Sequence, residues 1–448
     1  MPGIPTGAAR TQTTPKAWQP WLLSILVALL PLSFSIDLRL KALPVAVLFL
    51  VGIGLIARRQ PVRECYRAAG PVMAAALVMF GFIVLSALAH GLGWRPLDRA
   101  AHILLFLVIA AAFSQPLRME LVWGGFSLSA MLLGAACVVQ HHVLGIERAY
   151  GLNGGASASI QLATVLLGLA LLALVQLLGT RAARVEKMLH GGALLLAVYG
   201  ALLTQSRGPL LAFTPMFALL LVLHVRRSGR WRGALLLAAV AALGLAATLF
   251  ASRVPMMERF EAIPQEVTSF DHRGAAGGAV RERLEMWRTA ARAVNTHPWS
   301  GIGLDGYATY VQGEVAAGRS NPVIARYNQP HNEYLRAAVT GGIPGLLVLL
   351  LVFALPLRYF IAHLRDAADA VALPARAGVA VVGLYMLCAL TDSVFYRVMS
   401  QSFYFFLVLG LAVLISRQRV ARATSGRTDD VARTPPQGTP RPAADQAA

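Results

Sequence analysis

Arg207 is the first residue whose type and position suggest chemistry, because it lies where two long apolar runs meet. An arginine near hydrocarbon costs roughly 2.5–3.5 kcal/mol unless its guanidinium reaches the interface or is paired. It is therefore either an anchor at the membrane surface or a ligand whose planar fork grips a lipid phosphate, a task that suits Arg better than Lys. Arg283 and Arg288 lie five residues apart on a predicted helix, so they do not share one narrow face.

His331 is a candidate for proton transfer. A helix is predicted to begin near Pro330-His331, because proline is tolerated at the first helical position. On this helix His331, Tyr334 and Leu335 would share one face. The positive end of the helix dipole disfavours imidazolium, and a neutral imidazole can take a proton from a hydroxyl. The alternative is that His331 only forms hydrogen bonds at the helix start.

The sequence offers little for a metal or a nucleotide cofactor. The predicted external face has no DxD pair and no paired carboxylates at helical spacing, and its single acids Asp37 and Asp305 are interpreted as caps or turn formers. Residues 301–306 spell GxGxxG, but no predicted strand precedes them, so they predict a tight turn. We therefore expect metal-independent chemistry without a cofactor.

The elements that position these residues are predicted to be membrane-spanning helices. The sequence of 448 residues is 57% hydrophobic and only 14% charged, whereas soluble domains are nearer a quarter charged. Its net charge of +19 is explained mostly by arginines in short loops, so nucleic acid is an improbable partner. Cys65, Cys137 and Cys388 are isolated and predict neither a disulfide framework nor a zinc site. Twelve spans are predicted, at 21–36, 42–57, 70–90, 100–115, 120–141, 159–179, 188–205, 208–225, 233–252, 343–361, 375–393 and 399–416.

The positive-inside rule orients these spans. One set of alternating loops holds fifteen Arg and Lys residues and the opposite set holds seven, so both termini are predicted to be cytoplasmic. The predicted organisation is a cytoplasmic tail at 1–20, spans at 21–252, a large external loop at 253–330, a helix start and three spans at 331–416, and a disordered tail at 417–448. Within the loop a helix is predicted at 280–294, and Pro298 should stop it.

The order of the motifs resembles the superfamily of O-antigen ligases and O-antigen polymerases of bacterial envelopes. The matching elements are Ser206-Arg207-Gly208, Arg283-Leu284-x-x-Trp287, His297-Pro298-Trp299-Ser300-Gly301-Ile302-Gly303, and His331-Asn332-x-Tyr334-Leu335 before a glycine-rich span start. They cover residues 204–345 by motif, and the topology covers the whole chain.

The resemblance implies an all-α polytopic fold of the GT-C-like glycosyltransferase type in the bacterial inner membrane, with its site facing the periplasm. It implies transfer of O-antigen glycan from undecaprenyl pyrophosphate to a sugar hydroxyl of lipid A–core, with inversion. By the same resemblance His331 activates the acceptor, Arg207 and Arg283 bind the donor pyrophosphate with Arg288 as a substitute for Arg283, and Asn332 and Tyr334 support the site.

Three alternatives stay open at this stage. An O-antigen polymerase and a protein O-oligosaccharyltransferase belong to the same superfamily, and these motifs do not separate their acceptors. A polytopic transporter or flippase belongs to another class. Transporters usually carry charged or broken elements near the midplane in repeated halves. The polar residues here are concentrated in one external loop instead, which favours an enzyme.

Overall fold

The computed structural model describes residues 18–36, 42–58, 62–152, 158–179, 183–233, 235, 238 and 279–433, and its regular elements in these ranges are all helices. Nine of them are long and apolar enough to cross a membrane, or ten if the bent pair α2–α3 forms one span. α1 is apolar but has only 17 residues. The predicted span at 233–252 lies almost wholly outside the described residues, so the count of twelve stays a prediction.

Each of the other predicted spans overlaps a helix. The helices are α1 (Trp18–Phe34), α2 (Ala42–Ala57), α3 (Val62–Ala68), α4 (Gly70–Ala89), α5 (Arg95–Ile109), η2 (Ala110–Ser114), α6 (Met119–Val138), η3 (Val139–Val143), α7 (Ser159–Leu177), α8 (Arg184–Leu203), α9 (Arg207–Ser228), α12 (Ala279–Thr296), α13 (Tyr307–Ala316), η5 (Pro322–Arg326), α14 (Glu333–His363), α15 (Asp369–Cys388) and α16 (Val398–Arg433). The chain is thus a multi-pass membrane protein.

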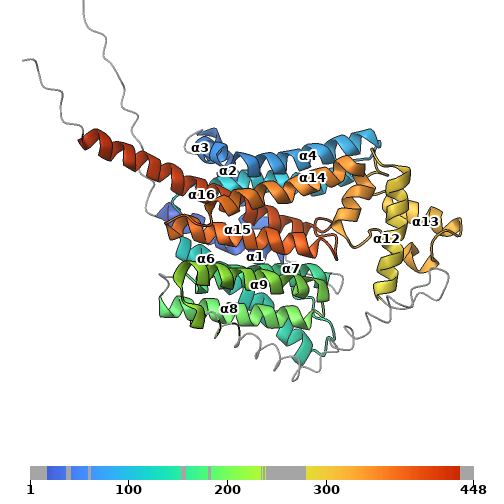
Figure 1. Cartoon of the computed structure of the whole chain (residues 1–448), viewed down its shortest axis with the longest axis horizontal. Coiled ribbons are helices and arrows are strands. Elements are labelled where there is room, and N and C mark those ends of the chain that lie inside the picture. The colour runs from blue at the N-terminus through green and yellow to red at the C-terminus, as the bar shows by residue number, and fades with distance from the viewer. Residues whose placement is uncertain are drawn as a thin grey trace, which may run out of the picture.

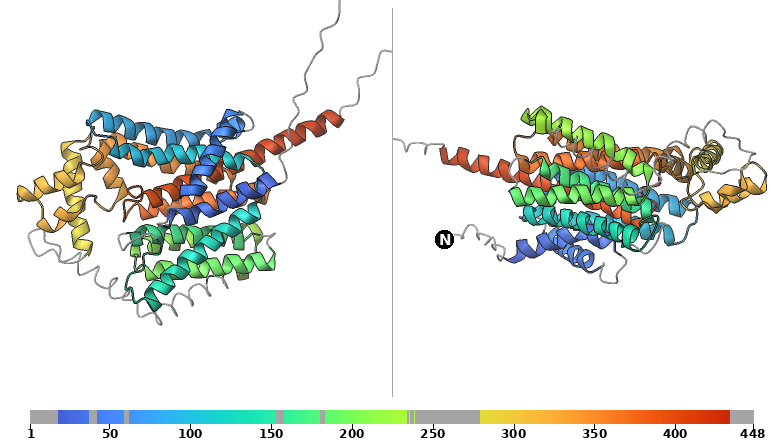
Figure 2. Two further views of the ribbon diagram at one scale, coloured as in Figure 1. Left: turned by 180° about the vertical axis from the view of Figure 1, so that it is seen from behind. Right: turned by 90° about the horizontal axis from the view of Figure 1, so that it is seen from below.

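The spans form a bundle with α7 and α16 at its centre (Figure 2). In α16 and α7, 94% and 83% of the most apolar stretch is buried, against 28% in the peripheral α9. A helix that is apolar all round belongs inside. The outer helices instead expose large apolar side chains such as Leu50, Leu88 and Leu195, as a lipid-covered surface requires.

The last helix departs from the predicted boundary. A disordered tail was expected from residue 417, but α16 continues to Arg433 and extends beyond the bundle (Figure 1). The first of its extra turns, residues 417–423, hold three Arg, two Ala and one Gln, which are good helix formers. Arg419 contacts His363, the last residue of α14, and Arg422 pairs with Asp366 in the loop after it, so this part of α16 is attached to the end of α14 and its loop. Residues 434–448 lie outside the described part.

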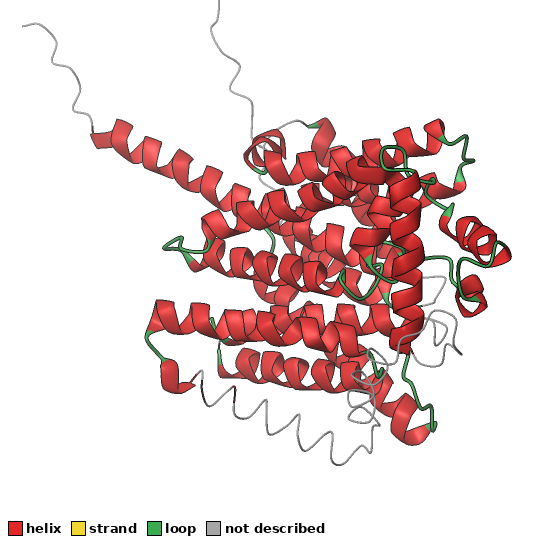
Figure 3. Ribbon diagram, turned by 45° about the vertical axis from the view of Figure 1, so that its right-hand side comes forward, coloured by secondary structure: helices red, strands yellow, loops and turns green. Residues whose placement is uncertain are grey.

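A small layer of helices covers the opposite end of the bundle, where α12 and α13 lie beyond the ends of the spans (Figures 1 and 3). Met286 and Ala290 of α12 pack with Tyr307 and Val311 of α13 and with Val339 of α14. The predicted helix at 280–294 is confirmed, and α12 ends at Thr296 just before the predicted stop.

Glycines let this layer approach α14 closely. Gly301 has φ +65°, and a Cβ on it would lie 2.5 Å from the backbone nitrogen of Gly341. The turn predicted at 301–306 is confirmed by the backbone hydrogen bond from the N–H of Gly306 to the carbonyl of Gly303. α14 is broken at Gly342, whose φ is +64°. The next residue, Ile343, donates its backbone N–H to the carbonyl of Pro298. The first turns of α14 are therefore held against the layer rather than in line with the span.

Candidate functional site

His331 lies just before α14 rather than in its first turn, which corrects the predicted helix start. Asn332 is the N-cap, and its side chain accepts a hydrogen bond from the backbone N–H of Leu335 at 3.0 Å. Such a cap satisfies one of the unpaired donors of the first turn, so it starts the helix after itself. His331 therefore does not share the helical face predicted for it. Its backbone is left-handed, with φ 49°, a conformation that non-glycine residues keep mainly at functional sites.

The partner of His331 is Asp392, which follows α15. Nδ1 of His331 lies 3.1 Å from Oδ1 of Asp392. The aspartate side chain is 4% exposed and the histidine side chain 22% exposed, so only the histidine is open to a substrate. An ionised carboxylate only accepts hydrogen bonds, so the proton belongs on Nδ1 and Nε2 keeps its lone pair. The pair can take a proton from a hydroxyl at Nε2.

Further side chains hold the segment that carries Asp392. Gln161 at the start of α7 donates to Oδ2 of Asp392 at 3.4 Å. The side-chain amide of Asn332 donates to the carbonyl of Leu390 at 3.1 Å, and the Tyr334 hydroxyl donates to the carbonyl of Met386 at 3.0 Å. The two residues predicted to support the site thus join α14 to the end of α15.

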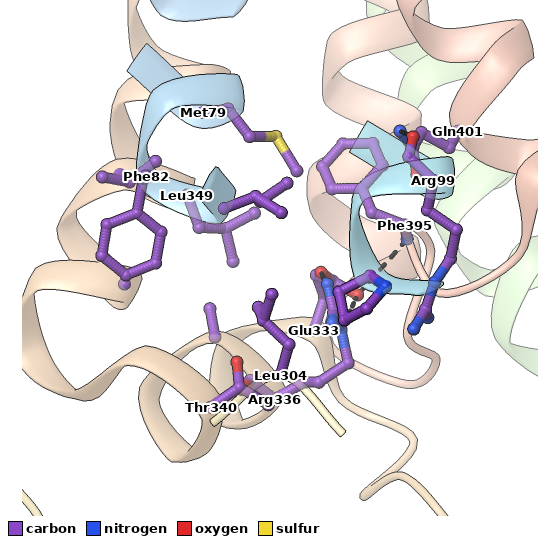
Figure 4. Close-up of a pocket in the computed structure, with 15 residues that line it drawn as sticks. Met79, Phe82, Arg99, Leu304, Glu333, Arg336, Thr340, Leu349, Phe395 and Gln401 are labelled. Atoms are coloured by element: carbon purple, nitrogen blue, oxygen red, sulfur yellow. Dashed lines mark hydrogen bonds and ion pairs between the residues drawn. The ribbon is translucent and has the colours of Figure 1, made fainter. Parts of the chain in front are cut away.

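Glu333 completes this connection from inside the protein. Its buried carboxylate accepts from Arg336 at 2.5 Å and from the backbone N–H of Phe395 at 3.3 Å. The pair lines a narrow cavity of about 60 Å³ between α4, α5 and α14, beside apolar side chains that include Met79 (Figure 4). This cavity has room for only a few water molecules, so it is too small to bind a sugar and is interpreted as a packing defect.

Arg207 begins α9 at the same end of the bundle. The residue before its N-cap, Gln205, has φ 54°, the other left-handed non-glycine residue in the described part of the chain. A Cβ on Gly208 would lie 2.2 Å from the hydroxyl of Thr391, so this turn packs directly against the neighbour of Asp392. The N-terminus of α9 adds the positive end of a helix dipole, which favours an anion.

Arg148 also lies at this turn, although its sequence context did not suggest it. Its Nε donates to the carbonyl of Thr204 at 2.9 Å, and its Nη2 lies 3.4 Å from the hydroxyl of Ser206. The guanidinium of Arg148 thus stabilises the turn before Arg207 and places a second positive charge at this turn.

The structure separates the two arginines of α12. Trp287 donates its indole N–H to the carbonyl of Pro330 at 2.9 Å, which turns its face of α12 toward His331. Arg283 lies one turn earlier on that face, half-buried. Arg288 is exposed, and its nearest acid is Glu285 at 3.8 Å. Only Arg283 lies on the side of α12 that faces His331.

No three His, Cys, Asp or Glu side chains gather into a possible metal site within the described ranges. Asp37 lies outside those ranges. Asp305 pairs with Arg99 at 2.8 Å, in agreement with a structural role at the turn.

Comparison with known proteins gives a match to a family and to a curated relative. The profile of the family described as O-antigen ligase matches residues 192–350, a range that includes Arg207, Arg283 and His331 but not Asp392. An uncharacterized protein of Haemophilus influenzae is 24% identical over 292 residues, which is 64% of this chain and 72% of the relative.

Proposed function

We propose, from the premise that this chain belongs to the O-antigen ligase and polymerase superfamily, that it is an O-antigen ligase of the bacterial inner membrane. It would move a glycan from undecaprenyl pyrophosphate to a sugar hydroxyl of lipid A–core at the periplasmic face. The observation that carries the proposal is that the His331–Asp392 pair lies beside the start of α9, where Gly208 packs against Thr391. This arrangement brings a proton acceptor close to Arg207, the proposed phosphate ligand. A GT-C-like fold with twelve spans remains part of the proposal.

In this mechanism His331 acts on the acceptor. Its Nε2 takes the proton of the sugar hydroxyl while the hydroxyl oxygen bonds to the anomeric carbon of the donor. The bond from that carbon to the pyrophosphate oxygen breaks, and undecaprenyl pyrophosphate leaves with the bonding electrons. Asp392 stabilises the imidazolium that forms. Direct attack inverts the anomeric centre.

The arginines act on the donor. Pyrophosphate is a good leaving group, and fixed positive charge stabilises the negative charge that develops on it. Arg207 at the start of α9 and Arg283 on α12 are the proposed ligands, and Arg148 braces the turn that carries Arg207. Arg288 is left out of the proposal, because it is exposed and does not share the face of α12 that carries Trp287.

Substitution of the arginines tests this division. Arg207→Lys keeps the charge but loses the fork, so donor affinity and turnover should both fall by about tenfold to a hundredfold. Arg283→Ala should show a smaller loss of both, and Arg288→Ala should stay near wild type. Donor binding and transfer would be measured on purified variants at equal concentration. An equal loss for Arg288→Ala and Arg283→Ala would contradict the assignment on α12.

Chelation tests the chemistry that the arginines are proposed to supply. With purified protein, lipid-pyrophosphate donor and lipid A–core, EDTA should change the transfer rate by less than about threefold, since no step needs a metal as Lewis acid. A larger loss that Mg²⁺ or Mn²⁺ restores would refute metal independence, and Asp37 would be the first ligand to substitute.

The acceptor is tested in a Gram-negative strain that lacks its own ligase. Expression of this protein should restore the ladder of lipopolysaccharide bands on a gel, whereas His331→Ala should leave only the core band. Lengthening of the lipid-linked glycan without attachment to the core would support a polymerase, and glycosylated pilin would support a protein oligosaccharyltransferase. Passage of the glycan across the membrane without transfer would support a flippase.

A further inference from the structure

A second cavity lies at the end of the bundle opposite to His331. α15 packs against both α9 and α14, and each of the three helices runs from one end of the bundle to the other (Figure 1). Their site ends carry Arg207, His331 and Asp392, and their far ends surround a cavity of about 810 Å³. This volume is within the range of small-molecule and cofactor sites. Four arginines and one aspartate line it.

Arg376 is the central feature of this cavity. It lies seven residues into α15, about 10 Å from the helix start, and is only 7% exposed. It forms no ion pair or hydrogen bond with any residue that the structure describes. A buried charge is normally paired, because removal of a guanidinium from water is unfavourable unless its donors find acceptors. Arg376 lines the cavity, so an anion in the cavity would supply those acceptors.

The acids near Arg376 are already engaged by other arginines. Arg227 pairs with Asp369 at 2.7 Å. Asp366, the one aspartate of the lining, pairs with Arg422 at 3.0 Å and accepts from a backbone N–H, and these hydrogen bonds hold the pKa of its carboxyl below its usual range. Both acids therefore make their direct contacts with other arginines, and the charge of Asp369 acts on Arg376 only from a distance.

Two further arginines of the cavity lining could also bind an anion. Arg226 at the end of α9 and Arg365 after α14 are exposed, and neither forms an ion pair within the described ranges. With Arg376 they bring three guanidinium groups to one cavity from three different elements. Planar donors of this kind bind the oxygens of phosphate in pairs, which favours phosphate over a simple monovalent anion.

The remaining lining suits the apolar part of a lipid. Leu223, Ile361 and Leu364 line the cavity next to the arginines, and Ile361 is 51% exposed on the outer surface of the bundle. Phosphate ligands beside an exposed apolar wall match a headgroup with its hydrocarbon chain. A free phosphate would use the arginines alone.

We propose that this cavity binds a phosphate ester group, held by Arg376 in its depth and by Arg226 and Arg365 at its mouth, and that anionic membrane lipids present this group. The site is separate from glycan transfer, because it lies at the other end of the helices that carry His331. By the loop charges of the sequence this end faces the cytoplasm, where short basic loops are concentrated.

Lipid binding by the full-length protein in detergent tests the proposal. Native mass spectrometry would count bound phosphatidylglycerol and phosphatidylcholine, and thermal unfolding would be followed with each lipid and with inorganic phosphate. Wild type should bind phosphatidylglycerol in preference to phosphatidylcholine and should gain thermal stability from it. Arg376→Gln should weaken phosphatidylglycerol binding roughly tenfold or more, and Arg376→Lys should retain part of it.

Two further variants separate the site from general effects of charge or folding. The double variant Arg226→Gln, Arg365→Gln changes only exposed residues and should also lose binding. Arg358→Gln is the control. Arg358 is an exposed arginine in the C-terminal half of α14 and does not line the cavity, so this variant should bind phosphatidylglycerol as wild type does. A response to inorganic phosphate that also depends on Arg376 would identify free phosphate as a second source of the same group. Equal phosphatidylglycerol binding by wild type, Arg376→Gln and the double variant would overturn the proposal.

Discussion

Replacement of His331 by alanine is expected to abolish detectable glycan transfer while donor binding stays near wild type. Loss of a general base typically lowers a rate by about 10²–10⁴-fold, or roughly 2.7–5.5 kcal/mol of transition-state stabilisation. The donor pyrophosphate is assigned to Arg207 and Arg283, so its affinity should not depend on the imidazole. Transfer and donor binding would be measured with the same purified preparation.

His297→Ala is the matched control for this variant. His297 is an exposed histidine at the same end of the bundle, directly after α12, and among the described residues its ring forms a hydrogen bond only with the hydroxyl of Thr296. Its substitution should leave transfer unchanged. Wild-type transfer by His331→Ala would leave His331 with only a structural role before α14.

Replacement of Asp392 by asparagine should lower transfer by up to about 10⁴-fold at nearly unchanged structure, which is the loss that the equivalent change causes in a serine protease triad. The asparagine amide can donate to Nδ1 of His331, and this hydrogen bond places the imidazole proton on Nε2. A protonated Nε2 cannot accept the proton of the sugar hydroxyl. The thermal unfolding midpoint would be recorded beside the rate, so that loss of folding is distinguished from loss of the correct tautomer.

Asp305→Asn is the control for the aspartate. Asp305 lies at the same end of the bundle, is about half exposed and pairs with Arg99, so its substitution should cost little transfer. If Asp392→Asn transferred glycan at the wild-type rate, Asp392 would be only a structural partner of His331.

The spans could be predicted from the sequence because their signal is local. A run of apolar residues long enough to cross hydrocarbon must form a helix, since no water is present to satisfy its backbone. The end of α16 was predicted wrongly for the opposite reason. Its last turns are polar, and the contacts of Arg419 and Arg422 with the end of α14 cannot be inferred from composition.

The site could be predicted only in part. Arg207 and His331 were identified as candidates by their residue types and by the motifs around them. Asp392 lies 61 residues from His331 along the chain and falls inside a predicted span, so nothing in its own surroundings indicated the contact. Arg148 lies in a short loop between two predicted spans, and no motif marks it as a site residue. The choice between Arg283 and Arg288 depends on the rotation of α12, which the bond from Trp287 to Pro330 fixes.

The start of α14 shows how a local rule can be overridden. Proline at a first helical position and an asparagine cap are both common, and the two predict helix starts that differ by a turn or less. Here Asn332 sets the start of α14, because its side-chain oxygen accepts a hydrogen bond from the backbone N–H of Leu335. His331 is thereby placed in a left-handed conformation before the helix, from which its ring reaches Asp392.

The most direct test of the central claim is a transfer reaction with purified wild-type protein, undecaprenyl-pyrophosphate-linked glycan and lipid A–core. Mass spectrometry of the products would be combined with NMR of the new glycosidic bond. The account predicts glycan attached to the core, undecaprenyl pyrophosphate released in equal amount, and an inverted anomeric centre. Donor that remains intact beside lipid A–core, or a product that retains the anomeric configuration, would contradict it.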